Sequence, residues 1–112
     1  MRFIMMYKPT AKTAGPPSPE TMAAIEKDIA EAKKSGKFVG NGGFYPLAKG
    51  AIVRRANGKA TVIDGPYAEA KEVIGGYAIF DLSSKEEAVE SAKGFLEMMG
   101  EGEVEIRQMY ES

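Results

Sequence analysis

Near its start the chain has a predicted β-strand that is apolar on both faces. Its two alternating sets of side chains are Phe3, Met5 and Tyr7 on one face and Ile4 and Met6 on the other. A second apolar strand is predicted for residues 73–82, interrupted by a pair of glycines. Strands of this kind are usually covered on both faces, so this feature restricts the fold more than any other.

The elements around these strands follow the order β-α-β, hairpin, β-α-β. Strands are predicted for residues 2–7, 38–45, 51–55, 59–63, 73–82 and 103–110, and helices for residues 18–36 and 84–100. The strand that begins at Phe38 contains several glycines, so a break or bulge is expected in it. Asn57-Gly58 between two β-rich segments is a strong hairpin signal. The pattern predicts a ferredoxin-like α+β domain, a split βαβ antiparallel sheet with two helices on one face and an inserted hairpin.

Capping residues and apolar stripes support both helices. Ser18 is a candidate N-cap before Pro19, and Ser83 or Ser84 is a candidate cap of the second helix. Gly36 and Gly100 are expected to end the helices. The inward-facing stripes are predicted to be Met22, Ile25, Ile29 and Ala32 in the first helix and Val89, Ala92, Leu96 and Met99 in the second.

Two helices can cover only one face of such a sheet. The other face would leave an apolar patch larger than monomers normally expose. A second copy related by a two-fold axis would cover it, which predicts a homodimer with stacked sheets, a dimeric α+β barrel. The alternative is that the inserted hairpin folds over this face instead.

Composition excludes several classes of chemistry. The chain has 112 residues with no His and no Cys, and its net charge is −1. Disulfides, cysteine nucleophiles and the commonest metal ligand are therefore absent, and no basic footprint for nucleic acid or an anionic membrane is present. No export signal or membrane-spanning stretch is evident, so a cytoplasmic protein made of one domain, residues 1–112, is expected.

The most distinctive stretch is Asp64-Gly65-Pro66-Tyr67, followed by Glu69, Lys71-Glu72 and Gly75-Gly76-Tyr77. It resembles the signature of the DGPF family within the YCII-related proteins. Family features also include Ser18-Pro19-Glu20, Gly42-Gly43, Pro46, Asn57-Gly58 and Val104-Glu105-Ile106-Arg107. The resemblance implies a ferredoxin-like fold, dimers, bacterial origin and a functional link to extracytoplasmic-function sigma factors. It implies no established reaction.

One departure from the family bears on catalysis. Many YCII proteins resemble enzymes because they carry a His on the first helix and an Asp in an Asp-Pro turn before the last strand. This chain has no His, and residues 95–102 contain no Asp-Pro turn. That dyad chemistry is therefore not carried over, and a non-catalytic function is favoured.

The charged residues of the signature allow two interpretations. Asp64 is expected to cap the turn by accepting the backbone N–H of Tyr67 or Ala68; as a ligand-facing carboxylate or general base it would need a raised pKa. Glu69, Lys71 and Glu72 form either a solvated turn or the polar rim of a pocket, with Lys71 binding an anion. A Mg²⁺ or Ca²⁺ site at these carboxylates has no recognised loop spacing in its favour, so no metal or other cofactor is predicted.

Two glycine pairs predict a dent in the sheet. The topology places Gly42-Gly43 beside Gly75-Gly76, on neighbouring strands. Tyr45, Tyr67, Tyr77 and Arg54 could complete a small-molecule pocket there, shaped in part by Gly65 and Pro66. The alternative at these glycines is a bulge or a close dimer contact.

The sequence leaves three functions open. The first is a homodimeric domain that binds a small molecule or a partner protein in bacterial signalling or regulation. The second is an enzyme in which Asp64, Glu69 or Tyr67 acts as acid or base, with Arg54 or Lys71 as an electrostatic aid, on a small carbonyl or lactone substrate. The third is an assembly domain with no ligand. The loop of residues 8–17 is expected to be a connector, with a lid as the alternative.

Overall fold

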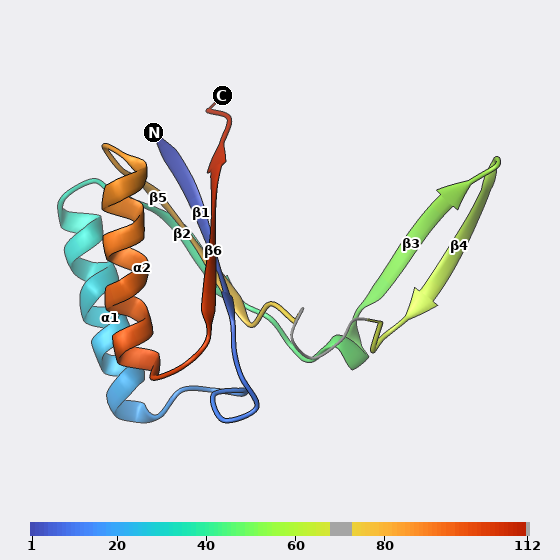
Figure 1. The fold of residues 1–112 in the computed structure, drawn as a ribbon, viewed down its shortest axis with the longest axis horizontal. Helices are drawn as coiled ribbons and strands as arrows, with labels where there is room; N and C mark the ends of the chain where they lie inside the picture. The colour runs from blue at the N-terminus through green and yellow to red at the C-terminus, as the bar shows by residue number, and fades with distance from the viewer. Residues whose placement is uncertain (68–72, 112) are drawn as a thin grey trace.

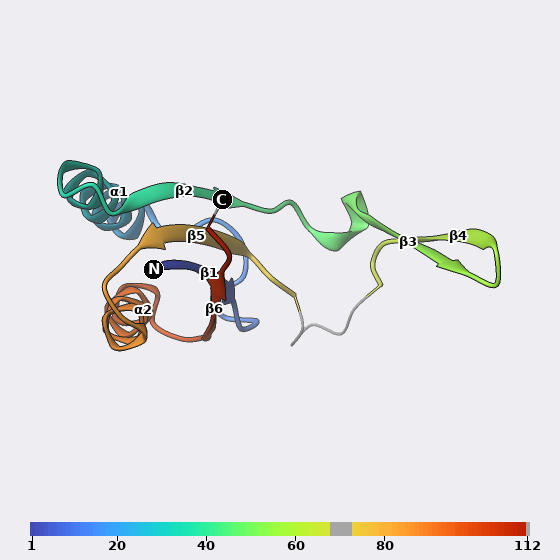
Figure 2. The same cartoon turned by 90° about the horizontal axis from the view of Figure 1, so that it is seen from above.

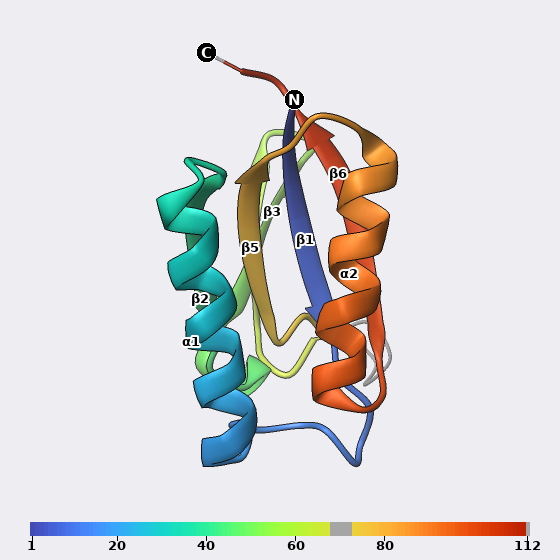
Figure 3. The same cartoon turned by 90° about the vertical axis from the view of Figure 1, so that its left-hand side faces the viewer.

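A four-stranded antiparallel sheet with two helices on one face forms the body of the protein. The computed structural model describes residues 1–67 and 73–111. The sheet contains β1 (Arg2–Lys8), β2 (Phe38–Gly43), β5 (Gly76–Asp81) and β6 (Glu103–Met109) in the order β2-β5-β1-β6. Helices α1 (Pro19–Lys34) and α2 (Lys85–Met99) lie on one side of it (Figures 1 and 3). This arrangement confirms the predicted ferredoxin-like α+β fold.

The inserted hairpin stands apart from this body. It consists of β3 (Ala51–Ala56) and β4 (Lys59–Asp64), which follow a short 3₁₀ helix η1 (Leu47–Lys49). Among the described strands, these two pair with each other and with no other. Asn57 and Gly58 both have positive φ, 52° and 75°, as a tight hairpin turn requires. We name residues 51–64 the arm. Figures 1 and 2 show it projecting away from the sheet, so the alternative that the hairpin covers the sheet is wrong for this structure.

The arm makes the chain extended for its length. Its radius of gyration is 15.9 Å, whereas a compact domain of this size has about 13 Å. The radius of gyration is larger than that of a compact domain because the arm projects away from the core.

The core lies between the sheet and the helices. Phe3, Met5 and Tyr7 alternate with half-buried neighbours along β1, so the first of the two predicted sets faces the helices. Phe3 is 2% exposed. The core cluster also contains Leu82, Ala88 and Ala92, with Phe80, Val104 and Ile106 packed against it.

Helix ends follow the predicted caps. The Ser18 side chain accepts the N–H of Thr21, and Ser84, rather than Ser83, accepts the N–H of Glu87. Ser35 and Gly100 are the C-terminal caps, with Gly36 next to Ser35 in the left-handed region at φ 74°.

Four sequence predictions need correction. The strand predicted for residues 38–45 ends at Gly43. The strand predicted from Val73 begins at Gly76. Just before it, the Gly75 N–H donates to the Tyr7 carbonyl at 2.7 Å, and the Gly75 carbonyl accepts the Phe44 N–H at 3.0 Å. Met22 of the predicted α1 stripe is 39% exposed. None of the α1 residues is buried, and the most buried helix residue is Ala88 of α2. Tyr110 lies beyond β6 and is fully exposed.

Candidate functional site

The sheet face opposite the helices, which we call the open face, carries the second apolar set. The antiparallel register places Ile4 beside Ile79 and Met6 beside Tyr77, so all four side chains point to this face. Neither helix covers them (Figure 3). The prediction that β1 and β5 are apolar on both faces is confirmed.

A shallow depression lies on the open face. Its volume is about 200 Å³, and its lining residues are Ile4, Met6, Phe44, Ile74 and Tyr77. Four of these are fully apolar, and the fifth adds one phenolic hydroxyl. The depression can therefore hold an apolar or aromatic group and offer it a single hydrogen bond.

The glycine pairs shape this depression as neighbours. Gly42 lies opposite Tyr77 and Gly43 lies opposite Gly76 across the β2–β5 ladder. A Cβ on Gly42 would come 2.9 Å from the Tyr77 ring. The Tyr77 ring thus occupies the space that a side chain at position 42 would need. The centre of this ring lies 5.7 Å from that of the Phe44 ring, and the two ring planes are tilted by 31°. The predicted proximity of the pairs is confirmed, and the predicted bulge lies earlier in β2, between Phe38 and Gly40.

Ion pairs border the apolar part of the open face. Arg2 donates from Nε to Asp81 Oδ1 at 2.9 Å, and this hydrogen bond holds the pKa of the Asp81 carboxyl below its usual value. On the other side, Lys8 Nζ lies 3.1 Å from Glu105 Oε1, and Arg107 contacts Glu105 Oε2 at 3.4 Å. Hydrogen bonds from Lys8 and Arg107 lower the pKa of Glu105. The polar groups at this border are thus already paired within the chain.

The signature segment lies at the root of the arm. The Gly65 N–H donates to the Gly50 carbonyl at 2.9 Å, and the Gly65–Pro66 peptide bond is cis. Tyr67 lies against Gly50, where an added Cβ would come 3.3 Å from the tyrosine hydroxyl. Asp64, the last residue of β4, is exposed. Glu69, Lys71, Glu72 and the Ala68 amide lie outside the described residues.

The structure does not bring all the predicted site residues together within one chain. Tyr77 lines the depression. Arg54 and Asp64 lie on the arm, whose strands Figures 1 and 2 show well separated from the sheet. Tyr45 is 80% exposed, with the Lys49 ammonium 5.2 Å from its ring centre. Phe44, Ile4, Met6 and Ile74 were missed, although the two-faced pattern of the first strand already marked Ile4 and Met6.

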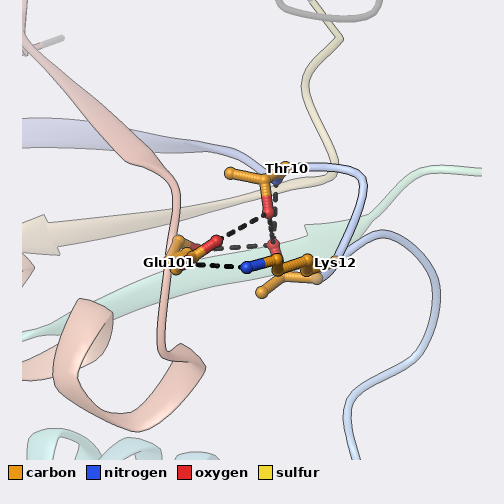
Figure 4. Close-up of polar contacts among 4 residues, drawn as sticks. Thr10, Lys12 and Glu101 are labelled. Atoms are coloured by element: carbon orange, nitrogen blue, oxygen red, sulfur yellow. Dashed lines mark hydrogen bonds and ion pairs between the residues drawn. The ribbon is translucent and has the colours of Figure 1, made fainter.

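A second polar cluster fixes the loop that follows β1. The Tyr7 hydroxyl donates to the Glu101 carbonyl at 2.6 Å and lies 2.9 Å from Thr13 Oγ1. Thr10 and Lys12 approach the Glu101 carboxylate, at 3.5 and 3.9 Å (Figure 4). These contacts join the loop to the start of β6, which supports a connector.

The described residues contain neither an acidic metal cluster nor a membrane-spanning helix. No group of three or more acidic side chains among them is arranged to hold a metal ion. Neither α1 nor α2 is long and apolar enough to cross a membrane.

Comparison with known proteins identifies the class. The chain matches the YCII-related domain over residues 1–111, and it belongs to that family. It is 32% identical over 72 residues to Uncharacterized protein R00369 of Rhizobium meliloti (strain 1021), a match covering 64% of this chain and 56% of that protein. The chain thus matches little more than half the length of that relative.

A solved structure is also similar over the whole chain. It is 5-chloro-2-hydroxyhydroquinone dehydrochlorinase (TftG) from Burkholderia phenoliruptrix AC1100 in complex with 2,5-dihydroxybenzoquinone. The TM-score is 0.46 at 11% identity, with 100% of this chain and 96% of that chain covered.

Proposed function

We propose that this YCII-related protein is a homodimer, paired through its open sheet faces, that binds a small apolar or aromatic molecule in the depression around Tyr77. Its setting is cytoplasmic signalling or regulation in a bacterium, with a functional link to an extracytoplasmic-function sigma factor. The signature at Asp64-Gly65-Pro66-Tyr67 supports its placement in the DGPF group.

The apolar lining of the depression is the observation that carries this proposal. Among the described residues that line it, Tyr77 has the sole ionisable group, and no carboxylate is present. The neighbouring charged side chains Arg2, Asp81, Lys8 and Glu105 are engaged in ion pairs with each other. Such a surface favours binding by burial over acid–base chemistry.

Pairing of the open faces follows from the same surface. Ile4, Met6 and Ile79 are half-buried although neither helix nor the arm, among the described elements, covers them. Stacking two such sheets about 10 Å apart would remove them from water. A stable interface of this type buries about 800 Å² on each copy.

The competing hypothesis is an enzyme of the same architecture. It would need Asp64, Glu69 or Tyr67 as acid or base beside the substrate, and Glu69 lies outside the described residues. Asp64 and Tyr67 are not among the residues that line the depression. Catalysis by Asp64, the last residue of β4, would therefore require the partner copy to supply it.

The dimer is tested by a charge placed on the open face. Met6→Asp puts an unpaired carboxylate into the proposed interface, and we expect the dimer dissociation constant to rise about 30-fold or more, the equivalent of about 2 kcal/mol. The matched control is Met22→Asp, on the exposed surface of α1, which leaves the constant unchanged. Sedimentation of the unaltered protein as a monomer at micromolar concentration would contradict the pairing.

Ligand binding is tested by a thermal-shift screen. Small aromatic acids, quinones and lactones are added to the unaltered protein and to Tyr77→Ala. A class of compound that binds raises the melting temperature of the unaltered protein by mass action. It leaves the melting temperature of Tyr77→Ala unchanged. No shift with any class contradicts the binding proposal, and turnover of a lactone lost in Asp64→Asn would instead establish the enzyme.

A further inference from the structure

The arm has exposed apolar side chains that the body of its own chain leaves uncovered. Val53 and Val62 lie opposite each other across the two strands and are 70% and 64% exposed. Among the described elements, β3 and β4 have extensive contacts with each other and with no other helix or strand. A lone two-stranded hairpin is marginally stable in water, so a surface that covers these valines would stabilise it.

The arm stands on the same side of the sheet as the open face. Figure 1 shows the helices, the sheet and the arm in that order across the molecule, and Figure 3, viewed from the helix side, shows β3 and β4 behind the sheet. Phe44 and Ile74, which line the depression, lie in the two segments that lead to the arm. A copy stacked on the open face would therefore lie next to the arm.

Charge favours a second copy of this chain as the partner. Arg54, Arg55 and Lys59 against Asp64 give the arm a net charge of +2, so the remainder of the chain, with a total of −1, carries −3. The edge strand β6 contributes a net −1 to this charge, from Glu103 and Glu105 against Arg107. The arm of one copy and the body of another thus attract each other.

Unpaired strand edges point to the same partner. Among the described strands, β6 pairs with β1 alone and so ends the sheet, and each strand of the arm also has one unpaired edge. Exposed edges of this kind accept a further strand.

We infer that the arm of each copy crosses the dimer and binds the body of the partner copy beside its depression. The ligand site is then completed by two chains, with the partner's arm closing over the apolar surface around Tyr77. This inference rests on the pairing of open faces proposed above and adds the element that encloses the ligand.

The first test removes the apolar surface of the arm. In the double variant Val53→Ser, Val62→Ser we expect the dimer dissociation constant to rise at least tenfold. Both side chains are exposed in the single chain, so its fold is preserved, which far-ultraviolet circular dichroism checks. The matched control is Met22→Ser on α1, with a change below twofold. If Met6→Asp weakens the dimer while the double variant does not, the arm inference fails and the pairing of open faces stands.

The second test exploits the absence of cysteine from the chain. A copy with Thr61→Cys in the arm is mixed with a tagged copy carrying Arg107→Cys on β6, and a short bismaleimide is added. We expect a covalent product between the tagged and untagged copies. The control Lys27→Cys, on α1 behind the sheet, gives none.

A chain carrying both Thr61→Cys and Arg107→Cys tests the alternative that the arm binds the sheet of its own chain. Cross-linking within that single chain, with none in the mixture of the two single-cysteine copies, would show that the arm folds onto its own sheet. That result overturns the inference even if the protein sediments as a dimer. Sedimentation as a monomer would instead remove the proposed pairing itself.

Discussion

The body and the arm of this protein are both built from antiparallel strands, but these strands lie in very different surroundings. Each strand of the body sheet has one face packed on helices, and Phe3 is 2% exposed there. Both strands of the arm expose nearly all their side chains, with Val53 70% exposed. β-propensity and a tight turn specify where a hairpin forms, whereas burial against other elements is what attaches a strand to a core.

The largest expected effect compares one core and one arm side chain. Phe3→Ala should lower the free energy of unfolding by about 3–5 kcal/mol, because it leaves a cavity in the core. Val53→Ala should change the unfolding of the body by less than about 0.5 kcal/mol, as is usual for exposed positions. Urea denaturation at one fixed, low protein concentration measures both, and similar losses for the two variants would contradict the contrast.

A second prediction concerns the glycine that accommodates Tyr77. Gly42→Ala places a methyl group 2.9 Å from the Tyr77 ring, so the ring must move. We expect the free energy of unfolding to fall by about 1–3 kcal/mol. The control Gly40→Ala lies in the same strand with nothing within 4 Å of its added Cβ. Calorimetry on both variants tests this, and an equal effect at the two positions would show that Gly42 has no role in seating the ring.

A third prediction is that a substitution in the hairpin turn destabilises the arm without affecting the body. Gly58 has φ 75°, so Gly58→Ala strains the hairpin turn by about 1 kcal/mol. The protection of arm amides from hydrogen exchange should fall, while that of β1 and β5 amides stays the same. Loss of protection in β1 would mean that arm and body unfold as one unit.

The smallest expected effect depends on pH at the Arg2–Asp81 pair. The pKa of Asp81 is lowered in the folded protein by the hydrogen bond from Arg2. The pair therefore stabilises the fold above the ordinary aspartate pKa of about 4, and this contribution is lost as the pH falls through the lowered value. The melting temperature of Asp81→Asn should lie below that of the unaltered protein at pH 7 and meet it near pH 2.

Salt provides the control for that prediction. Both side chains of the pair are partly exposed, so 1 M NaCl should shrink the difference at pH 7. A difference that persists unchanged at low pH and high salt would assign the effect to packing instead of charge.

Much of the candidate site could be predicted from the chain alone, and part could not. The neighbouring position of the two glycine pairs followed from the strand order, and the apolar character of Ile4 and Met6 followed from alternation along β1. The contribution of Phe44 and Ile74 was not predicted, because the sequence places both in strands, whereas β2 ends at Gly43 and β5 begins at Gly76. Outside a strand, alternation does not say where a side chain points. The separation of Asp64 and Arg54 from Tyr77 was also hidden, since sequence proximity to a turn does not fix where a hairpin points.

The kind and order of the elements, their caps and the two apolar faces of β1 could be predicted from the sequence, because each depends on residues near one another in the chain. Tertiary structure decided which face of β1 meets the helices, that the Tyr77 ring occupies the space above Gly42, and that the arm stands off the sheet. Those outcomes depend on how surfaces distant in sequence compete for burial, and local propensity carries no information about that competition.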